Sequence, residues 1–261
     1  MIINKIDMKS FTKVVFLLML LMPLVGRTQQ SIIGNLFTMD MEQKDLSFDI
    51  HFLENGEYCA EISSQETDDI VYTMVVSFGQ FQLDDGLIIM TDVLHDFQMQ
   101  LLIEGDTLYV QKGFGFMRDK KLHCWGKTSQ DNVYIKALNK DNLRQERELY
   151  EVQHKELHEL AFGKYKGMYW DCDLAINENH TYVYEFRECQ ISKGTWERKG
   201  NVLTLHDSSL DCDSYLLVGE KDSVISKVLI GDDTGGRVFK KVQPPTTAQP
   251  KTGGFGCSRR K

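Results

Sequence analysis

The sequence lacks the short motifs that identify the common enzyme active sites. It contains no Gly-x-Ser-x-Gly nucleophile turn, no glycine-rich phosphate-binding loop and no Cys-x-x-Cys pair. Its serine, histidine and aspartate residues also show no spacing typical of a catalytic triad. We therefore predict that the protein is not an enzyme, and the sequence calls for no cofactor.

No apolar run in the chain is long enough to span a membrane. The most apolar segment, Val14–Met22, is well short of the roughly 20 residues that a membrane-spanning helix needs. Lys9 and Lys13 precede it, and Pro23 and Gly26 interrupt the chain after it. This order of basic, apolar and small residues predicts a signal peptide over residues 1–28, a secreted or periplasmic location, and no stable membrane insertion after cleavage.

The chain carries an acidic excess, with a formal net charge of −8. Residues 1–28 contribute a net +3, so the chain without them carries −11. Such a surface repels nucleic-acid phosphates, which excludes nucleic acid as a general partner.

An internal duplication is the clearest positive signal in the sequence. The segment Ser77–Phe81 is similar to Ser192–Trp196, Leu87–Asp92 to Val202–Asp207, and Leu101–Ile103 to Leu216–Val218. One offset of 115 residues relates all three pairs. A repeat at a fixed offset indicates two copies of one folding unit.

Each copy consists of short alternating segments separated by polar turns. In the second copy, Tyr182, Tyr184 and Phe186 alternate with more polar residues, and Lys199-Gly200-Asn201 is a turn between two such segments. Roughly eight strands fit into each copy, which is typical of an up-and-down barrel or a half-open sandwich. The fold class we predict is all-β, with two tandem small antiparallel up-and-down barrels joined by one helix.

The domain boundaries follow from these patterns. We expect a first barrel over residues 29–122, a linker over 123–162, a second barrel over 163–242 and a disordered tail over 243–261. Opposite charges four residues apart predict a helix from Asp141 to Leu160 within the linker.

Three short motifs of the second copy resemble the lipocalin-like, calycin-type barrels of exported bacterial proteins. They are Gly163-Lys164-Tyr165, Gly194-Thr195-Trp196 and Arg237-Val238-Phe239. In that superfamily a Gly-x-Trp on the first strand packs under an arginine of the closing strand. Here Tyr165 stands where the tryptophan is expected, and the resemblance implies that Arg237 is the closing arginine. The first copy, with Arg118, departs further from the pattern.

Aromatic residues of the second copy are the candidate ligand-binding residues. They are Tyr169, Trp170, Tyr182, Tyr184 and Trp196. Such side chains line a cavity if the barrel is open, and at strand spacing they otherwise form the core.

A histidine pair supplies an alternative. His154 and His158 share one face of the expected helix and would hold one metal ion together with nearby carboxylates or thiols. Glu156 lies between them, which matches neither order of the zinc-peptidase motif.

Six cysteines are present, and three of them lie close together in the second copy. Cys172, Cys189 and Cys212 are candidates for a disulfide, and buried free thiols are the alternative.

The function that the sequence predicts is a secreted or periplasmic non-catalytic binding module. Its partner is an unknown small molecule or protein that meets a barrel mouth or the groove between the barrels. The alternative is a metal-dependent enzyme or metal carrier that uses His154 and His158.

Overall fold

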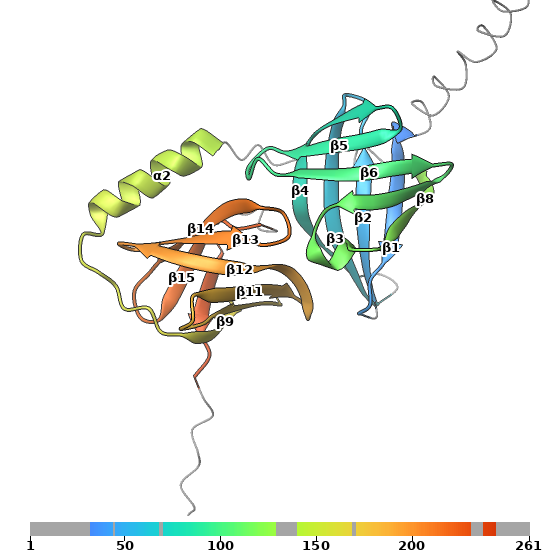
Figure 1. Ribbon diagram of the computed structural model, residues 1–261. Helices are drawn as coiled ribbons and strands as arrows, with labels where there is room; N and C mark the ends of the chain where they lie inside the picture. Colours follow the sequence, from blue (N-terminus) through green and yellow to red (C-terminus); the bar gives the residue numbers. More distant parts are fainter. Residues whose placement is uncertain are drawn as a thin grey trace, which may run out of the picture.

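Two closed antiparallel barrels make up the protein (Figure 1). The computed structural model describes residues 32–243, except residue 44 and residues 68–69, 129–139, 169–170 and 231–236. The expected signal peptide at 1–28 and the expected tail, apart from residue 243, lie outside the described residues. None of the described helices combines the length and the apolar character that crossing a membrane requires.

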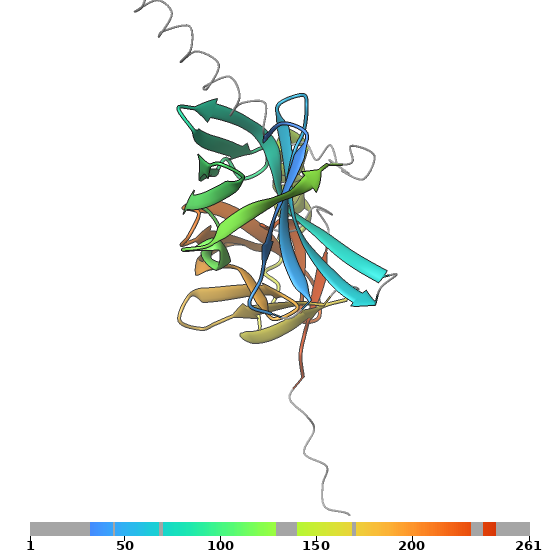
Figure 2. The same cartoon turned by 90° about the vertical axis from the view of Figure 1, so that its right-hand side faces the viewer.

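The first barrel closes in chain order, since each strand pairs with the next and β1 pairs with β8. Its strands are β1 Asn35–Asp40, β2 Leu46–Phe52, β3 Glu57–Thr67, β4 Ile70–Asp84, β5 Leu87–Asp92, β6 Gln98–Glu104, β7 Thr107–Lys112 and β8 Lys121–Lys127. A short 3-10 helix, η1, spans Gly115–Met117 between β7 and β8. Figure 2 shows the long β3–β4 hairpin reaching beyond the body of this barrel.

The second barrel repeats this order, with β9 pairing with both β10 and β16. Its strands are β9 Gly163–Gly167, β10 Cys172–Ile176, β11 Thr181–Phe186, β12 Cys189–Lys199, β13 Val202–Asp207, β14 Cys212–Val218, β15 Ser223–Val228 and β16 Val238–Lys241. The prediction of two all-β barrels joined by one helix is confirmed, and the last strand of the first barrel extends past residue 122.

The connecting helix, α2, spans Lys140–Gln153, so the prediction that it continues to Leu160 was wrong. Asn201 of the second barrel explains the early end. Its side-chain amide donates to the carbonyls of His154 and Glu156, and its Oδ1 accepts from the backbone N–H of His158. These bonds satisfy backbone groups that a longer helix would pair internally, and they hold the segment against the barrel.

Alternating side chains fill the barrel interiors. Along β2, Leu46, Phe48, Ile50 and Phe52 are buried, whereas the residues between them are partly exposed. This period of two follows from the pleat of a strand, which sends successive side chains to opposite faces. Interior positions of an eight-stranded barrel are nearly filled by such side chains.

A buried hydrogen-bonded network crosses the interior of the first barrel. The hydroxyl of Tyr58 lies 2.7 Å from the Ser77 hydroxyl, which donates to the Asp92 carboxylate at 2.8 Å. The same carboxylate accepts the backbone N–H groups of Leu94 and His95, each at 2.8 Å. The network therefore fixes the turn after β5 as well as the β3–β4–β5 contact.

The second barrel contains the same network. The hydroxyl of Tyr182 lies 2.7 Å from that of Ser192, which donates to Asp207 at 2.5 Å. Asp207 accepts the N–H groups of Ser209 and Leu210 at 2.8 and 2.7 Å. The serine, the aspartate and both turn residues are displaced by the 115 residues that relate the sequence repeats.

One glycine in each copy is required by the close approach of two strands. A Cβ atom on Gly79 would lie 2.0 Å from the carbonyl oxygen of Thr91, and one on Gly194 would lie 1.9 Å from that of His206. Neither oxygen is able to move away, because each belongs to strand backbone. The duplicated Ser-x-Gly motif thus has a packing origin in both barrels.

Candidate functional site

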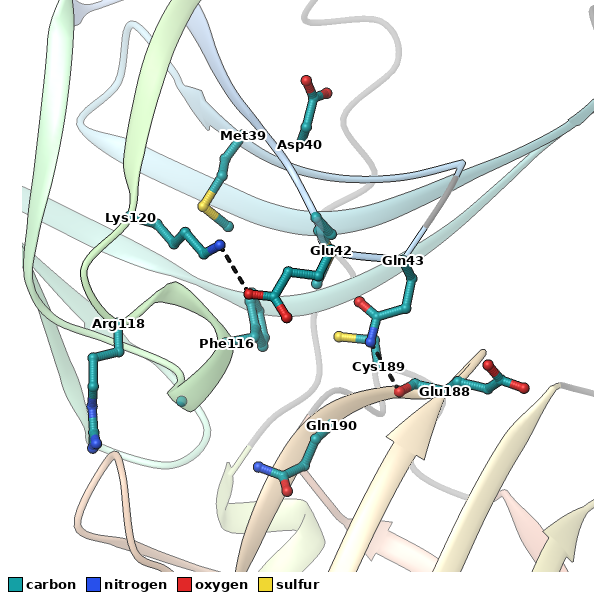
Figure 3. A pocket seen from close by; sticks show the side chains of 12 residues that line it. Met39, Asp40, Glu42, Gln43, Phe116, Arg118, Lys120, Glu188, Cys189 and Gln190 are labelled. Atoms are coloured by element: carbon teal, nitrogen blue, oxygen red, sulfur yellow. Dashed lines mark hydrogen bonds and ion pairs between the residues drawn. The ribbon is translucent and has the colours of Figure 1, made fainter.

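A groove of about 300 Å³ separates the two barrels and is the first candidate site (Figure 3). We name it the inter-barrel groove. It is lined by 12 residues from three parts of the chain. They are Met39–Gln43; Gly115, Phe116, Arg118 and Lys120; and Glu188–Gln190.

Packing inside the first barrel positions one wall of the groove. Phe116 of η1 stacks on Phe114 with ring centroids 5.2 Å apart and meets Phe48 edge-on at 5.3 Å. These contacts keep η1 against the barrel, and they leave Phe116 half-buried at the groove surface.

Charges of both signs line the groove. Lys120 pairs with Glu42 at 3.1 Å, and Asp40, Arg118 and Glu188 lie around this pair (Figure 3). The Glu42 side chain is 81% exposed, so solvent screens the pair. An ion pair of this kind is worth about 0–1 kcal/mol and exchanges readily for a pair with a ligand.

The opposite wall is a strained turn between β11 and β12. Arg187 and Glu188 have φ angles of 46° and 68°, in the left-handed region that glycine and asparagine normally occupy. Contacts with the first barrel hold this turn. Arg187 donates to the Ser64 hydroxyl, its guanidinium lies 4.9 Å from the centre of the Tyr72 ring, and Gln43 donates to the carbonyl of Glu188 at 3.1 Å. The turn is thereby part of the contact between the barrels.

Cys189 lies in the wall of the groove but is not a nucleophile there. Its side chain is buried, and burial together with the Glu185 carboxylate raises the pKa of the thiol to about 12. The thiolate, which is the reactive form, is therefore scarce at neutral pH.

A second depression, the Trp125 hollow, adjoins the groove on the first barrel. It measures about 430 Å³ and is lined by Thr38–Asp40, Tyr109, Asp119–Lys121, His123 and Trp125. Met39, Asp40 and Lys120 belong to both depressions, so the two form one continuous surface.

Trp125 lies at a β-bulge in the strand pair that closes the first barrel. Leu36 of β1 pairs with Gly126 and Phe37 pairs with Cys124, which leaves Trp125 between two paired positions. Alternation along β8 from the buried Leu122 places Trp125 on the outer face of the barrel. Trp125 is 78% exposed, more than any other exposed large hydrophobic residue that the structure describes.

Three of the five aromatic residues proposed from the sequence as ligand-binding are described by the structure, and they pack within the second barrel. Tyr182 belongs to the buried network, Tyr184 accepts a hydrogen bond from Arg237 at 2.8 Å, and the indole N–H of Trp196 donates to the Asn177 carbonyl at 3.0 Å. All three are buried and none lines the groove or the hollow. Tyr169 and Trp170 lie outside the described residues.

Tyr165 and Arg237 each contact other residues of the second barrel. The ammonium group of Lys241, which pairs with Tyr165 across β9 and β16, lies 5.2 Å from the centre of the Tyr165 ring. A terminal nitrogen of Arg237 donates to the Tyr184 hydroxyl and lies 2.9 Å from the Cys172 sulfur. The roles that the resemblance implies for Tyr165 and Arg237 stay a prediction.

The histidine pair does not lie on a helix face, because α2 ends at Gln153. The rings of His154 and His158 approach with centroids 5.6 Å apart, and His154 also stacks on Tyr150. In the described part of the chain, no group of three or more His, Cys, Asp or Glu side chains is placed to hold a metal ion.

The three clustered cysteines form no disulfide with one another. All three are buried in the second barrel. Burial and the Asp207 carboxylate raise the pKa of Cys212 to about 12, so Cys212, like Cys189, is an inert thiol.

Sequence reasoning missed the residues of the groove and the hollow. They come from β1 and the loop after it, from β7 to β8, and from the β11–β12 turn with the start of β12, which are three separate parts of the chain. The available signal was Trp125-Gly126, a large aromatic residue beside a glycine at the end of the first copy, because a glycine in a strand often marks a bulge.

Comparisons with known proteins add no family. No protein-family model and no curated protein matches the chain. Among solved structures it is similar to the DNA polymerase III subunit beta from Pseudomonas aeruginosa, at 9% sequence identity and a TM-score of 0.14. The match covers 80% of this chain and 57% of that one, and a TM-score this low carries no argument about fold or function.

Proposed function

We propose that this chain is an exported, non-catalytic binding module whose partner is an extended polypeptide segment. The segment lies across the inter-barrel groove and the Trp125 hollow. The observation that carries the proposal is the exposed side chain of Trp125 at a bulge beside two connected depressions.

The residue types of this surface favour a polypeptide partner. Trp, Tyr, Met and Arg are enriched where proteins meet, and here they are Met39, Met41, Tyr109, Arg118 and Trp125. Tryptophan is among the most frequent residues at binding hot spots.

The charges favour a partner that carries both signs. Lys120, Lys121 and Arg118 lie near Asp40 and Glu42 along the same surface. A partner of one sign only would meet repulsion over part of this path, whereas a mixed peptide finds complementary groups.

Export is proposed from residues 1–28. N-terminal sequencing of the protein from its native host tests this part, with a start near Gln29 expected. A mature protein that begins at Met1 or Met8 would contradict export, and it would leave the binding surface to be tested separately.

Selection of peptides from a displayed library against the full chain tests the binding surface. We expect the selected peptides to bind Trp125→Ala at least tenfold more weakly than the unchanged protein. Leu157→Ala, which removes an exposed side chain in the segment after α2, is the matched control and should bind normally. Equal binding to Trp125→Ala, or a library that yields no binder, would refute the proposal.

A further inference from the structure

A separate cavity of about 260 Å³ lies where α2 meets both barrels. Leu94 from the first barrel lines it, together with Asp141, Leu143, Arg144 and Arg147 of α2 and Thr204, Asp213, Ser214 and Tyr215 of the second barrel. It shares no residue with the inter-barrel groove or the Trp125 hollow.

The apolar wall of this cavity is fixed by packing. Leu94, Leu143 and Tyr215 are buried and belong to one cluster that joins α2 to both barrels. The hydroxyl of Tyr215 donates to the carbonyl of Leu143 at 2.7 Å. Burial raises the pKa of Tyr215 to about 12, so this hydroxyl keeps its proton at neutral pH and the wall stays in place.

Most charges around the cavity already have a partner. Arg144 pairs with Asp141 at 3.3 Å, and Asp213 meets His206 at 2.9 Å. Asp141 is thus paired with a cation, whereas Asp213, whose partner is a histidine that also meets Asp211, keeps a negative charge near the cavity.

Arg147 is the exception. It makes no ion pair with any residue that the structure describes, and its Nε atom is buried without a hydrogen-bond partner. Its guanidinium lies 5.4 Å from the centre of the Tyr215 ring, which holds the planar group at the cavity wall. The unpaired positive charge at the cavity wall favours an anionic ligand, which would bind the terminal nitrogens of the guanidinium.

We propose that this cavity binds a small organic monocarboxylate. The carboxylate accepts from the two terminal nitrogens of Arg147, since guanidinium presents two parallel donors to such a group. The apolar body of the ligand packs on Leu94, Leu143 and Tyr215. Asp141 and Asp213 disfavour a dianion. The cavity volume is just below the range of pockets that bind drug-sized ligands, so a small acid fits best.

Titration calorimetry of the full chain with benzoate tests the proposal, with benzamide and inorganic phosphate as comparison probes. We expect saturable binding of benzoate, at least tenfold weaker binding of benzamide, and no binding of phosphate at the same concentrations. Saturable binding of phosphate as tight as that of benzoate would overturn the proposal, as would the absence of benzoate binding.

Variants assign the site. Arg147→Gln should lose benzoate binding by at least tenfold, and Arg147→Lys should retain part of it, because lysine keeps the charge but not the paired donors. Arg118→Gln in the inter-barrel groove is the matched control and should bind benzoate normally. Benzoate binding by Arg147→Gln equal to that of the unchanged protein would refute the site. Peptide binding at the Trp125 hollow should be unaffected by Arg147→Gln, so the two proposals fail independently.

Discussion

The two barrels agree in their interiors and differ where they close. Ser77 and Asp92 in the first barrel have the same partners as Ser192 and Asp207 in the second. The closing strands differ, because β8 carries a bulge at Trp125, whereas β16 pairs with β9 in unbroken register.

This difference separates structural residues from functional candidates. A barrel of eight short strands depends on its close strand approach and its buried network, so both copies keep them. The outer face of a closing strand is not needed for these internal contacts, and in the first barrel this face carries the exposed Trp125. We infer that the first barrel carries the binding surface and that the second supplies one wall of the groove.

The largest effect that tests the equivalence of the two barrels is expected from substitution of the equivalent glycines, Gly79 and Gly194. Gly79→Ala and Gly194→Ala should each destabilise the protein by more than about 4 kcal/mol, since the new methyl group collides with strand backbone. Denaturant unfolding measures both. Gly86→Ala is the control; that glycine has a positive φ but no atom within 4 Å of the added Cβ, and its cost should be about 1–2 kcal/mol. Losses at Gly79 and Gly194 no larger than at Gly86 would contradict the equivalence of the two strand contacts.

The buried networks give the next largest effect. Ser77→Ala and Ser192→Ala should each cost about 3 kcal/mol, because each removes one hydrogen bond from a buried carboxylate and leaves a buried tyrosine hydroxyl without its serine partner. The same denaturant midpoints check this. A large loss in one barrel and none in the other would show that the networks are not equivalent.

His95 sharpens the comparison, because the second barrel has Leu210 at the matching position. Burial raises the pKa of Asp92, but hydrogen bonds and the charge of His95 outweigh burial and lower it below the usual value of 3.8. A lowered carboxyl pKa stabilises the fold at pH values above the unfolded pKa, and this stability is lost as the pH falls through the folded value.

His95→Leu should therefore cost about 2 kcal/mol at pH 7 and move acid unfolding to higher pH. Unfolding curves between pH 3 and pH 7 measure both effects. An unchanged acid midpoint in His95→Leu would show that the histidine does not control the charge of Asp92.

Thiol reactivity gives the smallest effect. Cys124 in the closing strand of the first barrel is exposed, whereas Cys189 and Cys212 in the second are buried with pKa values raised to about 12. A thiol reagent at pH 8 should label Cys124 much faster than either buried cysteine. Peptide mapping reads the three rates, and rapid labelling of Cys189 or Cys212 in folded protein would contradict their burial.

The architecture was accessible from the sequence because its signals are local or repeated. The offset between Ser77 and Ser192 marks two copies, and alternation around Tyr182–Phe186 marks strands. The helix end was missed because Asn201, far along the chain, binds the backbone after Gln153. Charge spacing within a helix carries no information about such a contact.

The candidate site was not accessible in the same way. Alternation from the buried Leu122 accounts for the outward direction of Trp125, but only the closed barrel brings β1 and β7 beside it to form the hollow. Tyr182, Tyr184 and Trp196 illustrate the opposite case, since the same aromatic chemistry at regular strand spacing is buried. Arg147 could not be identified from the sequence either, because its lack of an ion pair among the described residues depends on how α2 packs on the second barrel.

Hydrogen exchange of the full chain with a selected peptide bound tests the central claim most directly. We predict that added protection falls on β8 around Trp125, on η1 and on the end of β1, with the second barrel affected only at the β11–β12 turn. Protection centred on β9 and β16, or spread equally over both closing strand pairs, would contradict the assignment of the binding surface to the first barrel.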